Sequence, residues 1–68
     1  MIPGAGSDFV LHQFADGLKH VVLLELREGE EIERETVGVY DEAIYGAIEA
    51  RLLAKNHFAD LLARLKRE

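Results

Sequence analysis

Three histidines are the residues of this chain best suited to bind a metal ion or to act as a general base. They are His12, His20 and His57. No HExxH motif or similar ligand spacing joins them. In the strand arrangement derived below, His12 and His20 lie on opposite faces of a sheet. We therefore expect structural or surface histidines and predict neither a metal nor a cofactor.

Residues for nucleophilic catalysis are equally poorly placed. The chain has no cysteine, which removes thiolate catalysis, thiolate zinc sites and disulfides. Ser7 falls in a glycine-rich start and Thr36 in an expected strand, so neither occupies a sharp catalytic turn. A chain of 68 residues also leaves little room for a pocket of about 300 Å³ or more. We expect no enzymatic activity from a single chain, and a site between copies is the alternative.

The element around which the chain is organised is an apolar stretch over residues 18–27. It is rich in leucine and valine and is bounded by two turn signals, Asp16-Gly17 and Glu28-Gly29. This pattern is typical of a strand that is paired on both edges. Everything else in the chain is expected to pair with this strand or to cover it.

Residues 8–14 predict a first strand, joined to the central one by a two-residue loop at Asp16-Gly17. This register gives one core face, formed by Phe9, Leu11, Val22, Leu24 and Leu26. The opposite face carries Val10, His12, Phe14, Lys19, Val21, Leu23, Glu25 and Arg27. A sheet face exposed to water should be mainly polar, and this one is not. The sequence therefore predicts a second face that needs a cover.

Residues 31–40 predict a third strand whose register the sequence leaves open. A three-residue loop would set Glu25 against Glu33, a repulsive pair. It would also place Arg34 on the face meant to be buried. A bulge near Gly38 is the alternative.

Glutamates are concentrated on this third strand and the turn before it. They are Glu28, Glu30, Glu31, Glu33 and Glu35. One interpretation is a solvated edge that resists edge-to-edge aggregation. The other is a surface that presents carboxylates to a basic partner.

The C-terminal third predicts helix, with Asp41 as N-cap and an Asp60–Arg64 pair at i,i+4. Its apolar stripe shifts along the helix, from Ile44, Ala47, Ile48 and Leu52 to Ala54, Phe58, Leu61, Leu62 and Leu65. A continuous helix over residues 42–67 would be about 39 Å long, against about 30 Å for a nine-residue strand. We expect either a break near Asn56 or a second half that packs on another subunit.

The expected fold class is α+β: a three-stranded antiparallel β-meander followed by one bent C-terminal helix or two short helices packed on one face (βββα or βββαα). Residues 1–7 are expected to form a flexible leader and residues 8–68 a single small domain. The chain shows neither a signal peptide nor an apolar run that could span a bilayer, so we expect no membrane partner and a cytoplasmic location.

The net charge of −5 is unevenly distributed. Residues 1–50 carry −8 and residues 51–68 carry +3. Because the strands belong to the acidic half, they are poorly suited to meet phosphates, and we do not expect nucleic acid as a partner.

The function expected from the sequence is that of a non-enzymatic, small acidic protein-interaction module that self-associates, with a homodimer favoured. A core this small rarely stabilises a chain by more than about 3–5 kcal/mol without help. The expected interface residues are Val10, Phe14, Val21, Leu23, Val37, Phe58, Leu61, Leu62 and Leu65. The alternative is an inhibitor or antitoxin-like protein that binds a basic macromolecular target, a heterologous protein partner, through Glu28, Glu30, Glu31, Glu33 and Glu35.

Overall fold

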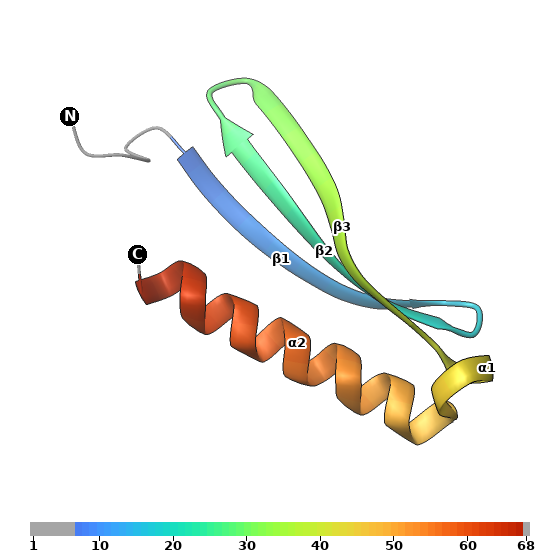
Figure 1. Ribbon diagram of the computed structural model, residues 1–68. Coiled ribbons are helices and arrows are strands. Elements are labelled where there is room, and N and C mark those ends of the chain that lie inside the picture. Colours follow the sequence, from blue (N-terminus) through green and yellow to red (C-terminus); the bar gives the residue numbers. More distant parts are fainter. Residues whose placement is uncertain (1–6, 68) are drawn as a thin grey trace.

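The computed structural model describes residues 7–67 and has the expected α+β architecture. Three strands, β1 (Ser7–Asp16), β2 (Lys19–Glu28) and β3 (Glu31–Asp41), precede two helices, α1 (Glu42–Tyr45) and α2 (Ala47–Arg67). Helix α2 lies along one face of the sheet, and the β2–β3 hairpin projects beyond it (Figure 1). The predicted βββα order is confirmed. The leader expected over residues 1–7 lies outside the described residues except for Ser7, which begins β1.

The sheet has the order β1-β2-β3, so β2 is paired on both edges, as its apolar composition predicts. The first loop is Gly17-Leu18 rather than Asp16-Gly17, with Gly17 at φ +62°. A positive φ at the first loop residue is typical of a type II′ turn and favours glycine. The pairing therefore moves by two residues, and Phe9 faces Leu26 instead of Leu24. A shift of two preserves which face each side chain occupies.

The sequence left the register of β3 open, and the pairing that a three-residue loop would give is wrong by one residue next to the loop. Glu25 lies opposite Arg34, not Glu33, because the loop Gly29-Glu30 has two residues. A one-residue shift transfers every side chain near the loop to the other face, so Arg34 leaves the face that we expected to be buried. The bulge expected near Gly38 is present, since the register changes between Val22 and Leu23.

The helical region begins as predicted but breaks elsewhere. The Asp41 side chain accepts a hydrogen bond from the Ala43 amide at 2.9 Å, which confirms it as N-cap. The interruption falls at Gly46, whose φ of +88° and ψ of 160° suit glycine alone. Of the two alternatives for the helix, the break near Asn56 is wrong, because α2 has 21 residues and continues through this position. At 1.5 Å per residue α2 is about 31 Å long and matches a ten-residue strand of about 33 Å.

The core between sheet and helix is small. Val22, Ala50 and Ala54 are fully buried there. The small side chains of these alanines, together with Gly38 of β3, allow α2 to approach the strands closely. The molecule measures 46 × 23 × 11 Å. Within residues 7–67 no helix is both long and apolar enough to cross a membrane.

Candidate functional site

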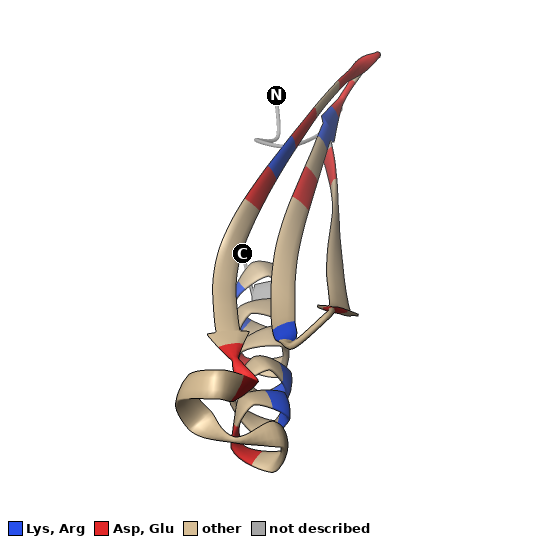
Figure 2. Cartoon of the chain, turned by 90° about the vertical axis from the view of Figure 1, so that its right-hand side faces the viewer, with Lys and Arg blue, Asp and Glu red and all other residues tan. Residues whose placement is uncertain are grey.

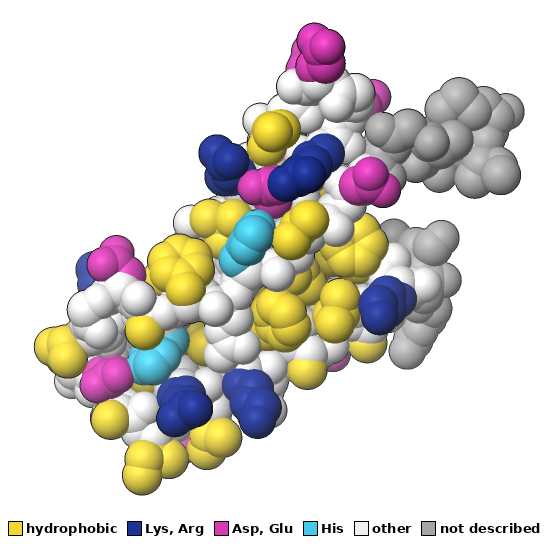
Figure 3. All heavy atoms as spheres, turned by 180° about the vertical axis from the view of Figure 1, so that it is seen from behind, with side chains coloured by type: hydrophobic (Ala, Val, Ile, Leu, Met, Phe, Trp, Pro, Cys, Tyr) yellow, Lys and Arg dark blue, Asp and Glu magenta, His cyan; other side chains and the backbone are white. Residues whose placement is uncertain are grey.

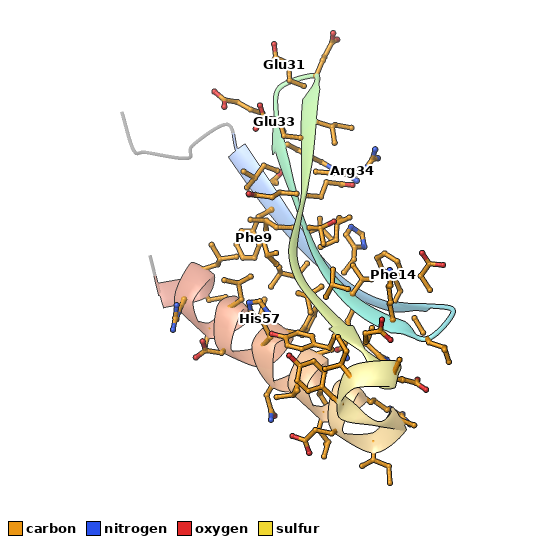
Figure 4. The ribbon with its side chains drawn as sticks, turned by 45° about the vertical axis from the view of Figure 1, so that its right-hand side comes forward. Phe9, Phe14, Glu31, Glu33, Arg34 and His57 are labelled. Carbon is orange, nitrogen blue, oxygen red and sulfur yellow. The ribbon has the colours of Figure 1, made fainter. Side chains whose placement is uncertain are left out.

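The face of the sheet turned away from α2 is uncovered and is called the open face here. The strand pairing places on it, among others, Asp8, Val10, His12, Phe14, Val21, Leu23, Glu25, Arg27, Ile32, Arg34, Thr36 and Val39. In Figure 4, Phe9 and Phe14 of the same strand point to opposite sides, Phe9 toward α2 and Phe14 away from it. The open face is therefore the second apolar sheet face that the sequence predicts from the alternation of side chains along β1 and β2.

Large apolar side chains of the open face remain in contact with water. Phe14, Ile32 and Val39 are 45%, 50% and 48% exposed. Val21 lies between β1 and β3 at the centre of the sheet and is nearly buried, although no helix lies over it. Hydrophobic side chains gather on this side of the molecule in Figure 3. An apolar surface of this kind marks an interaction site more often than a free surface.

A charged cluster adjoins these apolar residues. Arg27 Nε donates to Glu25 Oε2 at 2.8 Å, and Arg34 Nε donates to Glu25 Oε1 at 3.0 Å. The Glu25 side chain is only 5% exposed. His12 Nε2 lies 3.8 Å from Glu25 Oε1. The pKa of the Glu25 carboxyl lies below its usual value, mainly because of the hydrogen bond from Arg27 and secondly because of the one from Arg34. Desolvation of the carboxyl acts in the opposite direction and raises this pKa.

This cluster makes the open face easier to remove from water. Burial of a carboxylate without partners is unfavourable, whereas Glu25 already has two guanidinium donors. Asp8 lies opposite Arg27 in the strand pairing and offers a second negative charge on this face. The face thus combines apolar side chains with an internally compensated set of charges.

The expected interface residues fall into three groups. Val10, Phe14, Val21 and Leu23 lie on the open face, and Val37 lies at the bulge of β3. The four helical residues are half-buried and continue the inward stripe that begins at Ala50 and Ala54; they are Phe58, Leu61, Leu62 and Leu65. These four residues of α2 therefore face the sheet of their own chain.

Several exposed apolar residues were not among the expected interface residues. Ile32 reaches the open face because of the true β3 register, and Val39 lies there opposite Val21. At the other end, Ile44, Ile48 and Leu52 are exposed, with Ile48 at 78%. In the sequence, Gly46 is the residue that could have indicated the exposure of this second group. It ends α1 and so changes the direction of the helix that follows.

A groove of about 470 Å³ lies between the start of α2 and the end of the sheet. Its lining consists of His20, Glu42, Ala47, Ile48, Arg51, Leu52 and Lys55. His20 Nε2 donates to Glu42 Oε2 at 2.6 Å across the groove wall. A chain of this length was expected to leave little room for a pocket of about 300 Å³ or more, and the groove exceeds that volume.

The histidines do not form one site. His12 lies on the open face, His20 lines the groove, and Nδ1 of His57 is hydrogen-bonded to the Tyr40 hydroxyl at 3.0 Å. Within the described part of the chain, no group of three or more potential ligands could hold a metal ion.

The five glutamates at and near the tip of the β2–β3 hairpin are all exposed; they are Glu28, Glu30, Glu31, Glu33 and Glu35. Figure 2 shows acidic residues at its tip, whereas basic residues follow α2. The register places Glu31, Glu33 and Glu35 on the same face as Leu24 and Leu26, opposite the open face. The acidic surface and the open face can therefore be altered independently.

Comparison of the chain with protein-family models, with curated proteins and with solved structures found no match.

Proposed function

We propose that this chain is a non-enzymatic interaction module that self-associates through its open face, most simply as a homodimer. The observation that carries the proposal is the uncovered apolar surface on a sheet whose other face already holds α2. Phe14, Ile32 and Val39 are each about half exposed there. Covering them would add to the small core of Val22, Ala50 and Ala54.

A second copy is the simplest partner for this surface. A flat face can pack on an identical face around a two-fold axis, so that every contact is made twice. Glu25 already has two arginine partners, and therefore no uncompensated carboxylate would be buried with it. The cytoplasmic location expected from the sequence remains a prediction.

Substitution of Leu23, which lies near the middle of the open face, tests the proposal. Leu23→Glu should raise the dissociation constant of the dimer by about tenfold or more, since a charge would be buried at a central contact. Phe14→Glu tests the same face at a more exposed position. Leu18→Glu is the matched control, because Leu18 is 61% exposed in the β1–β2 turn and lies off the open face.

Light scattering gives the molar mass of each variant, and circular dichroism reports whether it is folded. If the Leu23 and Phe14 variants fold and assemble as the Leu18 control does, the open face is not the interface.

A second candidate function rests on the projecting hairpin. Its exposed glutamates form an acidic surface on the part of the hairpin that projects beyond α2. Such a surface is suited to a basic macromolecular target. Replacing Glu31, Glu33 and Glu35 together by glutamine should leave the molar mass unchanged and abolish capture of such a target. Capture that is equal for both forms of the chain would contradict this role.

A further inference from the structure

The groove beside α2 contains two basic residues that have no acidic partner in the part of the chain that the structure describes. Arg51 and Lys55 are four residues apart, so both side chains lie on the same face of the helix and line the groove. Neither takes part in any of the ion pairs of residues 7–67. In contrast, Arg64 of the same helix pairs with Asp60 at 3.1 Å.

The one carboxylate of the groove is already engaged. Glu42 accepts the hydrogen bond from His20 at 2.6 Å, and both side chains are largely shielded from water. The groove therefore offers two cations that form no ion pair within residues 7–67, and one compensated anion. It also lies at the start of α2, because Ala47 and Ile48 line it, and the helix dipole there favours negative charge.

The remaining wall is apolar and open to solvent. Ile48 is 78% exposed and Leu52 47% exposed, although both border a depression of about 470 Å³. This volume falls within the range of about 300–1,000 Å³ found for small-molecule sites. Figure 3 shows two basic side chains beside a histidine and an acidic side chain, with hydrophobic side chains next to them.

We propose that this groove binds a small organic anion: an oxyanion group, such as a carboxylate, held by Arg51 and Lys55, and an apolar body against Ile48 and Leu52. Charge favours an anion because neither Arg51 nor Lys55 pairs with an acidic residue among residues 7–67. The exposed isoleucine and leucine favour an organic body over an inorganic ion. The site lies on the helix side of the sheet and is independent of the open face.

Hexanoate is a suitable probe, because it combines a carboxylate with a short alkyl chain. Titration into the full-length ¹⁵N-labelled chain should produce saturable NMR shifts at residues 47–55 and at His20. Hexan-1-ol has the same body without the charge, and inorganic phosphate has the charge without the body. Both should bind at least about tenfold more weakly than hexanoate, since each lacks one half of the interaction.

Matched variants locate the oxyanion subsite. Arg51→Gln combined with Lys55→Gln should weaken hexanoate binding by about tenfold or more. Arg64→Gln is the control, because it removes one positive charge from the same helix outside the groove, and its affinity should equal that of the wild type.

Several results would overturn the proposal. They are equal affinity for hexanoate and hexan-1-ol, an undiminished affinity in the Arg51/Lys55 double variant, and the absence of saturation in the millimolar range. Shifts at the groove that follow protein concentration instead of hexanoate would identify it as a contact between copies. The comparison of hexanoate with hexan-1-ol needs only the wild-type chain, so it decides the matter even if the double variant does not fold.

Discussion

His57 of α2 lies directly over Gly38 of β3. A Cβ atom at position 38 would stand 2.5 Å from Nδ1 of the imidazole and 3.2 Å from the Tyr40 ring. The imidazole cannot easily move away, because its Nδ1 is hydrogen-bonded to the Tyr40 hydroxyl. This contact fixes how closely α2 approaches the sheet next to the bulge, and glycine is the residue that permits it.

Gly38→Ala should therefore destabilise the fold by about 1–3 kcal/mol, the usual cost of inserting a methyl group into a packed site. Urea unfolding of the variant and the wild type measures the difference. In a His57→Ala background the same substitution should cost clearly less, because the clashing ring is absent. An equal cost in both backgrounds would contradict the contact.

The pKa of Glu25 predicts a pH dependence of stability. The hydrogen bonds from Arg27 and Arg34 hold this pKa in the folded chain below its usual value of about 4.5. The unfolded chain therefore binds the proton more readily, and the stabilisation from Glu25 is present above about pH 4.5 and is lost as pH falls through the lower folded pKa. Glu25→Gln should be less stable than wild type at pH 7, and the difference should shrink below about pH 4.5.

Glu31→Gln is the control for this comparison, because Glu31 is exposed at the hairpin tip and takes part in none of the ion pairs of the described residues. Its stability relative to wild type should change little over the same pH range. A gap between wild type and Glu25→Gln that stays constant from pH 7 to pH 3 would show that the arginines do not hold the Glu25 charge.

Gly46 separates α1 from α2 and sets the direction of the long helix. Its φ of +88° with ψ of 160° lies in a region that only glycine occupies without strain. Gly46→Ala should destabilise the chain by about 1–3 kcal/mol in thermal or urea unfolding. Ala43→Gly, a substitution inside α1, is the comparison, with an expected cost of about 1 kcal/mol or less. If Gly46→Ala were neutral, the bend would not depend on this backbone conformation.

Much of the fold could be predicted from the sequence, because its signals are local. The apolar run of β2, the glycine-containing turns and the Asp41 cap each act over a few residues, and all three predict the correct elements. The two faces of the β1–β2 pair were also predicted correctly, since an error of two residues in a hairpin leaves the faces unchanged.

The register of β3 could not be predicted in this way. A two-residue loop at Gly29-Glu30 and a bulge near Gly38 change the pairing in two places, and a one-residue change reverses the faces. The cluster of Glu25, Arg27 and Arg34 was missed for this reason. The groove was missed because it depends on the bend at Gly46, which brings residues of α2 beside His20 and Glu42.

Molar mass in solution tests the central claim, self-association through the open face, most directly. Light scattering is measured over a concentration series of the full chain, at low salt and at about 1 M salt. The two salt concentrations separate apolar from electrostatic association, because charges are screened over a Debye length of only about 3 Å at 1 M. We predict a mass of twice the chain value of 7.6 kDa that persists at high salt. A mass of 7.6 kDa at every concentration would contradict the claim.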